Sequence, residues 1–282
     1  MTHIDYAMSN ADYHDKEKHP HISSSDVKAV HKKSLLHWAL EQNMPRTESK
    51  AMLMGSAIHG MILEPEKKEF VRGLPNRLKR KEWAELEEKC AKSGQTLLTE
   101  SEYDEAERIT ETAKQTCETL RYVLSHKRFI PEASIFTECR DTKLPIKCRP
   151  DAMILPDEHG KGGMLFDVKT TTDATPEAFQ HEIKKWAYDL QAAFYIHTCQ
   201  QAKININSFI FFAVEKPTGI CVAYELSELY LSYGRRNMFR AMHEIAEAKK
   251  TGNFTTGWDS INTIHMPSYL EDKYLAESET PF

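Results

Sequence analysis

The front of the chain shows the apolar spacing of helices. The segment 23–43 begins with three serines that can cap a helix, and its apolar residues predict one helix or two short ones. In the segment 50–63, apolar residues recur at steps of three and four, which predicts a helix with one face on a core. Gly55 and Gly60 interrupt this helix, at a cost of about 1 kcal/mol each relative to Ala. We expect these glycines to allow close packing or to leave room for a ligand beside His59.

The period of the pattern changes after Pro131. Strands are predicted over 134–139, 144–155 and 164–170, because apolar runs there are separated by polar turns. A long helix is predicted over 176–202, a hairpin over 207–226, and a last helix from the Ser227 cap to about Lys250, with a stop at Gly252. The polar residues 1–20 predict an irregular arm, and 253–282 an irregular tail. This order of elements predicts a mixed α/β core behind a helical front section.

Composition adds limits to this picture. The chain has 282 residues and a formal charge of −5, with 28% charged and 40% hydrophobic residues, an ordinary globular balance. No apolar run approaches the roughly 18 residues of a membrane-spanning helix, and no signal peptide is visible, so we expect a cytoplasmic protein with no membrane partner. The six cysteines form no CxxC pair. We therefore expect reduced, buried thiols, without a structural zinc site or a disulfide framework.

The densest chemical signal lies in residues 148–170. Asp167 and Lys169 are two positions apart on a predicted strand, so both side chains point to one face. A short turn connects this strand to the one that carries Asp151, so an antiparallel pair would place Asp151 beside Asp167. Two adjacent carboxylates favour a cation between them, and oxygen ligands favour Mg²⁺, which Mn²⁺ can replace. Lys169 could then orient a water that the metal activates. The alternative is a surface Asp–Lys pair without a metal.

Other polar residues could serve this site. Gln191 and Tyr195 are four residues apart on a predicted helix, so they share a face. Lys147 and Arg149 alternate on one strand face, which suits a phosphate of DNA. The loop 72–81 is basic, and it either holds phosphates or is a solvated charge run. Its candidate DNA-binding residues are Arg72, Arg77, Lys79, Arg80 and Lys81.

At this point a family resemblance becomes visible. The sequence resembles the exodeoxyribonuclease VIII (RecE) branch of the RecB-like PD-(D/E)xK nuclease superfamily, from about residue 8 to residue 270. The matching stretches, in order, are Met8–His14, Ile22–Asp26, Gly55–Gly60 with Leu63–Pro65, Lys147–Asp151, Asp167–Thr170 and Gln191–Tyr195. The last four resemble the family's G-x-x-x-H-x-x-x-x-E-P, K-x-R-x-D, D-x-K-T and Q-x-A-x-Y elements.

The resemblance implies a fold and a set of roles. The fold is a restriction-endonuclease-like PD-(D/E)xK core, in which helices flank a central mixed sheet. A single domain would cover 21–282 after the arm 1–20, with a helical front section (about 21–130), a catalytic core (about 131–250) and a C-terminal tail (251–282). The resemblance implies metal binding by His59, Asp151, Asp167 and the Val168 carbonyl, and catalysis by Lys169. It implies that Gln191 and Tyr195 support the site and that Glu132 assists it. For His59 and Glu132, the resemblance alone supplies the role.

The implied activity is Mg²⁺-dependent exonuclease digestion of linear double-stranded DNA. The resemblance implies the 5′→3′ direction, a 3′ single-stranded product for a RecT-like annealing protein, and a ring-shaped homo-oligomer, with a tetramer favoured. Three alternatives stay open: an endonuclease, a single-strand nuclease, and a DNA-binding recombination module without catalysis. A nucleotide-binding or serine-hydrolase enzyme is disfavoured, because the chain lacks a P-loop, a Gly-rich dinucleotide loop and a G-x-S-x-G elbow.

Overall fold

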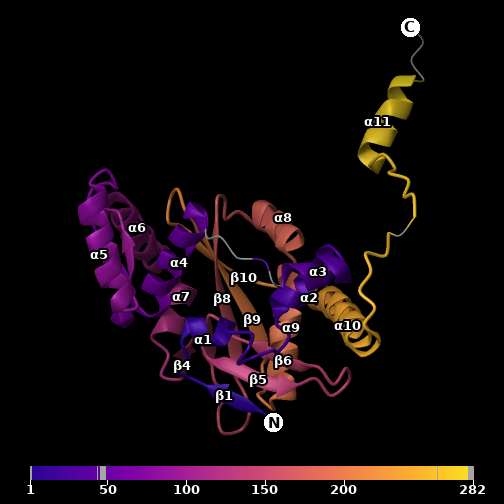
Figure 1. Cartoon of the computed structure of the whole chain (residues 1–282), viewed down its shortest axis with the longest axis horizontal. Coiled ribbons are helices and arrows are strands. Elements are labelled where there is room, and N and C mark those ends of the chain that lie inside the picture. The colour runs from indigo at the N-terminus through magenta and orange to yellow at the C-terminus, as the bar shows by residue number, and fades with distance from the viewer. Residues whose placement is uncertain (1, 43, 45–48, 259, 279–282) are drawn as a thin grey trace.

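A five-stranded mixed sheet forms the centre of the molecule (Figure 1). The computed structural model describes residues 2–42, 44, 49–258 and 260–278. The strands of the sheet, in spatial order, are β10 Cys221–Glu225, β9 Ser208–Glu215, β8 Met164–Thr171, β7 Ala152–Ile154 and β4 Phe129–Pro131. β8 and β9 are parallel, and the other neighbours are antiparallel. The prediction of a mixed α/β fold is confirmed.

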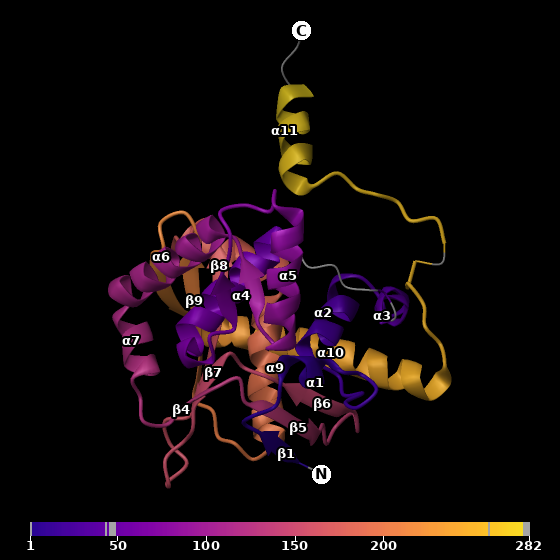
Figure 2. The same cartoon turned by 60° about the vertical axis from the view of Figure 1, so that its left-hand side comes forward.

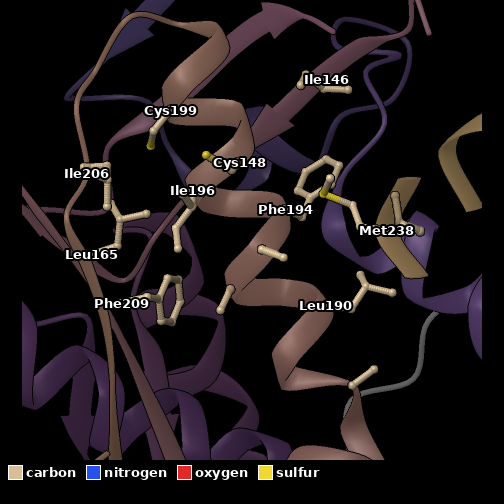
Figure 3. Close-up of a cluster of buried hydrophobic side chains, with 14 of the residues drawn as sticks. Ile146, Cys148, Leu165, Leu190, Phe194, Ile196, Cys199, Ile206, Phe209 and Met238 are labelled. Atoms are coloured by element: carbon tan, nitrogen blue, oxygen red, sulfur yellow. The ribbon is translucent and has the colours of Figure 1, made fainter. Parts of the chain in front are cut away.

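Helices cover both faces of this sheet (Figures 1 and 2). One face packs on α4 Lys50–Leu63, α6 Glu100–Thr116 and α7 Glu118–Leu124. The other face packs on α8 Pro176–Trp186, α9 Tyr188–Gln201 and α10 Glu228–Thr251, which α2 Ser24–Lys32 and α3 Leu35–Glu41 extend. Alternation along the strands divides the two cores: Phe212 belongs to the first, and Phe209 and Phe211 belong to the second. Figure 3 shows the second core, where Ile196 of α9 lies toward Leu165 and Phe209, and Phe194 and Leu190 lie on the side of Met238.

The N-terminal segment is part of the fold, so the predicted irregular arm is wrong. β1 His3–Asp5 adds to β5 Ser134–Glu138, which pairs with β6 Pro145–Cys148, in a second antiparallel sheet. The helix α1 Asn10–His14 follows, and the Ser9 side chain accepts a hydrogen bond from Asp12 N. Tyr13 of α1 is buried. The side chains of Ile4 and Tyr13 pack against residues that are distant in the sequence. The mostly polar composition of the segment therefore gave no sign of this packing. Met1 lies outside the described residues.

Most predicted helices occur as expected. The segment 23–43 forms the two short helices α2 and α3, with Asn43 outside the described residues, and 50–63 forms α4. Ser227 caps α10 by accepting from Tyr230 N, and Gly252 ends that helix in the left-handed region (φ 74°). The remaining elements are the 3-10 turn η1 Pro65–Lys67, β2 Phe70–Arg72, α5 Arg80–Lys92, β3 Thr96–Leu98 and α11 Ser268–Ser278.

Three predicted elements need correction. The strand predicted over 144–155 is divided into β6 and β7, because Cys148 pairs with Ile135 in one sheet and Ala152 pairs with Phe166 in the other. The helix predicted over 176–202 is divided into α8 and α9 at Ala187, whose φ and ψ are both 51°. The tail contains α11, although its surroundings are irregular as expected; residues 259 and 279–282 lie outside the described chain. The boundaries proposed at about residues 130 and 250 stay predictions.

Two expectations about composition can be compared with the structure. All six cysteines are buried and free, as predicted. Among the described residues, no helix combines the length and the apolar character that crossing a membrane requires.

Candidate metal and active site

Three acidic residues lie in one row across three adjacent strands. Pro131 of β4 is opposite Ala152 of β7, and Ala152 is opposite Phe166 of β8. The next position along each strand places Glu132, Asp151 and Asp167 side by side. The backbone confirms this placement: Glu132 N donates to Asp151 O (3.0 Å), and Val168 N donates to Asp151 Oδ2 (2.6 Å). The predicted approach of Asp151 to Asp167 therefore follows from strand register.

The helix α4 brings His59 to this row. His59 Nε2 lies 2.9 Å from Asp151 Oδ2 and 3.6 Å from Glu132 Oε1. One ligand atom each from His59, Glu132 and Asp151 lies within 4.8 Å of the others, a spacing that fits a single metal ion. Glu132 holds a left-handed backbone (φ 52°), a conformation that a non-glycine residue adopts at a cost and that is common at functional sites. Arg149 Nε contacts Glu132 Oε2 at 2.5 Å and fixes the carboxylate.

Asp167 points into the space between β8 and α9. Its side chain is 1% exposed; Gln191 Nε2 donates to Oδ1 (2.5 Å), and Lys169 Nζ forms an ion pair with Oδ2. Lys28 of α2 donates in turn to Gln191 Oε1 (3.0 Å). The Lys169 ammonium lies 4.9 Å from the centroid of the Tyr188 ring. Asp167 and Lys169 thus share a face, as predicted, and Gln191 holds the carboxylate in place.

The site carries strongly perturbed titrations. Burial and the charge of Asp151 raise the pKa of Asp167 to about 6. Burial, with Asp151 as a further cause, raises the pKa of Glu132. For His59, burial opposes the charged form, but the carboxylates of Asp151, Glu132 and Asp167 outweigh it and raise the pKa to about 9. Similarly, burial opposes ionisation of Lys169, and the Asp167 carboxylate still raises its pKa to about 12. Crowded negative charge of this kind favours a bound cation.

The site opens into a cleft of about 1110 Å³. Its walls come from the N-terminal segment, α4, the turn before β3, and β8 with Tyr188. Gly55 and Gly60 both line it, and both also permit close packing. A Cβ on Gly60 would lie 3.0 Å from Phe70 Cε2, and one on Gly55 would lie 3.3 Å from Thr170 Oγ1. The expected close packing of these glycines is therefore confirmed, and the binding of a ligand beside His59 stays a prediction.

The family comparison agrees with this geometry. Residues 23–265 match the model of a PDDEXK-like domain of unknown function, DUF3799. The chain belongs to this PDDEXK-like family. The letters of that description correspond to Pro150-Asp151 and to Asp167 and Lys169 in this sequence. The chain is therefore placed in the PD-(D/E)xK nuclease superfamily. Its membership of the RecE branch stays a prediction.

Structural comparison supports the same fold. A crystal structure from Eubacterium rectale, of a protein provisionally described as an exonuclease, is 14% identical in sequence with a TM-score of 0.57. The match covers 95% of this chain and 98% of that one, and at this identity it shows the fold alone. The protein SSO0001 is also 14% identical, over 67% of this chain and 86% of that one, with a TM-score of 0.28. This TM-score is too low to indicate a shared fold. No protein with a curated description matches the chain in sequence.

The remaining predicted site residues of this PDDEXK-like chain lie nearby. Val168 lines the cleft, and its N–H orients Asp151, so the assignment of its carbonyl to the metal stays a prediction. Tyr195 lies one turn of α9 beyond Gln191 and packs on Phe209, with 6.0 Å between the ring centroids. Its role also stays a prediction.

The predicted DNA-binding residues have protein partners. Lys147 and Arg149 are 4% and 8% exposed, and Lys147 Nζ donates to Tyr13 O (2.6 Å) and His19 O (3.1 Å). The N-terminal segment covers the strand face that was expected to meet a phosphate. Contact of these two residues with DNA stays a prediction, and their burial argues against it.

The basic loop 72–81 is partly neutralised. Arg72 pairs with Asp104 (2.7 Å), Arg77 with Glu102 (3.0 Å) and Lys79 with Glu82 (3.2 Å). Arg80 and Lys81 are exposed at the start of α5. The DNA-binding role of this loop stays a prediction.

Sequence reasoning missed two residues beside the site, Lys28 and Tyr188. Lys28 is 163 positions before Gln191 in the chain. No local pattern marks such a distant pair. Tyr188 follows the hidden break at Ala187, and the continuous apolar pattern of 176–202 gave no signal for it. Glu132 was expected only to assist, whereas the geometry places its carboxylate among the candidate metal ligands.

Proposed function

We propose that this protein is a metal-dependent DNA nuclease. The observation that carries the proposal is the row of Glu132, Asp151 and Asp167 across β4, β7 and β8, with His59 at one end and Lys169 beside it. Two or three carboxylates with one imidazole fit Mg²⁺, and the nitrogen ligand makes Mn²⁺ an equally suitable ion. Membership of a PDDEXK-like family supports the same chemistry.

The residues divide the work of phosphodiester hydrolysis. A divalent ion at this site would polarise a phosphoryl oxygen and lower the pKa of a bound water. His59, Glu132 and Asp151 would hold the ion, and His59 must release its proton to do so. Lys169 stays protonated and can orient the attacking water or stabilise negative charge on the phosphate. Gln191 keeps Asp167 aimed at the site.

We further propose the RecE-type reaction, digestion of linear double-stranded DNA in the 5′→3′ direction. The 3′ single strand that remains would pass to a RecT-like annealing protein. The support is the order of the RecE-like motifs, whose residues 55–60, 147–151, 167–170 and 191–195 converge on one site. The provisional exonuclease description of the Eubacterium rectale protein of the same fold is in agreement.

A ring-shaped homo-oligomer, with a tetramer favoured, belongs to the same proposal. The C-terminal tail gives a physical reason for assembly, because α11 stands apart from the rest of the molecule in both views (Figures 1 and 2). Ile261 and Ile264 are 100% and 95% exposed, and Tyr269 and Tyr274 of α11 are also exposed. Apolar surface of this kind marks an interaction site. Sedimentation should show a tetramer at micromolar concentration; a monomer would contradict assembly.

End-labelled DNA tests the activity. Linear duplexes labelled at the 5′ or the 3′ end, and a closed circle of the same sequence, are incubated with Mg²⁺ or with EDTA. We expect rapid release of the 5′ label in Mg²⁺ only, with the circle intact. Cutting of the circle would instead establish an endonuclease, and digestion confined to unpaired strands would establish a single-strand nuclease. No cleavage in Mg²⁺ or Mn²⁺ would refute the nuclease proposal.

A further inference from the structure

A hollow of about 270 Å³ lies beside the active-site cleft, where α2 meets the junction of α8 and α9 (Figure 1). The described residues that line it include three lysines and two aromatic residues, and no carboxylate. We call it the lysine–tryptophan surface; it consists of Lys28, Lys32, Lys33, Trp186 and Tyr188. Lys33 pairs with Glu41 at its edge, so Lys28 and Lys32 supply its inner charge.

This surface continues from the active site. Tyr188 lines both the cleft and the hollow, and its ring lies 4.9 Å from the Lys169 ammonium. Lys28 Nζ donates to Gln191, which donates to Asp167. The left-handed backbone of Ala187 places Trp186 and Tyr188 on either side of a sharp turn. A chain that leaves the cleft past Tyr188 would therefore reach Lys28 and Trp186 next.

The side chain of Trp186 on this surface is unusually exposed. It is 44% exposed, although a large aromatic residue is mostly buried in a typical fold. Its indole N–H donates to Glu182 (2.5 Å), which holds the ring in position. The ammonium groups of Lys32 and Lys185 lie 5.1 Å and 4.9 Å from the ring centroid. A fixed aromatic ring among lysines combines a stacking surface with charge for phosphates.

We propose that the lysine–tryptophan surface binds a single-stranded segment of the nucleic acid next to the active site. Lys28 and Lys32 contact phosphates, and Trp186 stacks on a base. The inference rests on the proposed nuclease function, because it identifies how the same site holds its substrate. An unpaired strand is favoured over a duplex, because the hollow is small and only an unpaired base can lay its face on an indole ring.

The local charge supports an anionic ligand. Burial and the charge of Lys169 lower the pKa of Lys28 to about 8. A phosphate placed here would relieve the repulsion between these ammonium groups. Cation–π contacts of Lys32 and Lys185 with Trp186 could by themselves be a surface-stabilising arrangement. The continuity with the cleft through Tyr188, which lines both, distinguishes a substrate path from such an isolated contact.

Binding without metal tests this surface separately from catalysis. The full chain in EDTA is titrated into a fluorescein-labelled single-stranded oligonucleotide and into a blunt duplex, with anisotropy as the readout. Trp186→Ala should weaken single-strand binding about tenfold, and Trp186→Phe should largely restore it. Lys32→Ala should lower the dependence of log K on log salt by about 0.7, the share of one phosphate contact. Trp258→Ala and Lys161→Ala, at other exposed positions, are the matched controls.

The possible outcomes separate the two proposals. Loss of single-strand affinity in Trp186→Ala, with duplex binding and thermal unfolding unchanged, supports the surface. Unchanged single-strand affinity in Trp186→Ala and Lys32→Ala overturns it, while cleavage by the wild type leaves the nuclease function intact. An equal loss in the Trp258→Ala control also overturns it, because binding would then be nonspecific. Specific single-strand binding by a protein that never cleaves would retain the surface and refute the nuclease proposal.

Discussion

The carboxylate of Asp167 should destabilise the metal-free protein at neutral pH. It is 1% exposed, and burial with the charge of Asp151 raises its pKa to about 6, compared with 3.8 for an ordinary aspartate. The attraction of Lys169 is already contained in that value. Asp167→Asn keeps the size of the side chain and removes its ionisation. We therefore expect the variant to be inactive in cleavage and more stable than the wild type in EDTA.

The sign and the size follow from proton linkage. An acid whose folded pKa is raised contributes its full stability below the unfolded pKa of 3.8, and this contribution is lost as pH rises through about 6. A difference of about two pKa units corresponds to about 3 kcal/mol. Asp167→Asn should thus gain about 3 kcal/mol over the wild type at about pH 7.5 in EDTA, and the gap should narrow to about 1 kcal/mol near pH 4.5.

Metal should largely cancel this difference in stability. A bound cation favours the ionised Asp167, so the wild type should gain about 2.7 kcal/mol at a free Mg²⁺ concentration of about 100 times Kd. Asp167→Asn should gain much less, because a neutral amide does not attract a cation held by the neighbouring His59, Glu132 and Asp151. Without the carboxylate, the variant should therefore lose its higher free energy of unfolding when Mg²⁺ occupies the site.

Urea unfolding followed by tryptophan fluorescence measures these differences. The wild type and Asp167→Asn are compared in EDTA at both pH values and again with Mg²⁺. Asp272→Asn, at an exposed position of α11, controls for the loss of one negative charge. If Asp167→Asn is less stable than the wild type in EDTA at neutral pH, the inferred penalty on the buried charge is wrong.

Three further predictions concern other residues. Lys169→Ala should lower cleavage at least about a hundredfold in a gel assay while DNA affinity in EDTA is retained; equal activity would remove Lys169 from the mechanism. Burial and the charge of Lys147 lower the pKa of His21 to about 4. The free energy of unfolding should therefore fall by up to about 3 kcal/mol as pH drops from 6.5 to 4, because the unfolded chain binds the proton first. His21→Gln should reduce this pH dependence of the free energy of unfolding, measured by urea titration. Gly234→Ala should destabilise by about 3 kcal/mol in thermal unfolding despite its better helix propensity, because the new Cβ would lie 2.3 Å from Asp189 O. Gly55→Ala, whose Cβ would meet only a side-chain oxygen at 3.3 Å, should be nearly neutral.

Local pattern was sufficient where one element carries its own signal. The helix α4 has the predicted bounds 50–63, because its apolar positions face one core at helical spacing. The hairpin β9–β10 and the α10 caps at Ser227 and Gly252 follow from turn and cap chemistry. Asp167 and Lys169 could be paired from strand alternation alone. Each of these predictions depends on residues that are close in the sequence.

Tertiary pairing decided the features that were missed. β4 is three residues long, too short for an alternation signal, yet its pairing with β7 brings Glu132 beside Asp151. Lys28 reaches Gln191 only because α2 packs on α9. No signal in the sequence marked the break between α8 and α9 at Ala187, because the apolar pattern continues through it and the residue is not glycine. Such contacts appear only when distant segments are placed in three dimensions.

The change of sheet between Cys148 and Ala152 links the fold to the site. Cys148 pairs with Ile135 in the N-terminal sheet, and Ala152 pairs with Phe166 in the central one, so the chain crosses between sheets at residues 149–151. Pro150 suits this crossing because it offers no N–H to either ladder. The crossing frees Arg149 to hold Glu132 while Asp151 faces His59. In a continuous strand Arg149 and Asp151, which are two positions apart, would lie on one face of a single sheet. The crossing that the apolar pattern concealed instead places Arg149 between the two sheets, where it reaches Glu132, and Asp151 directly before β7, beside His59.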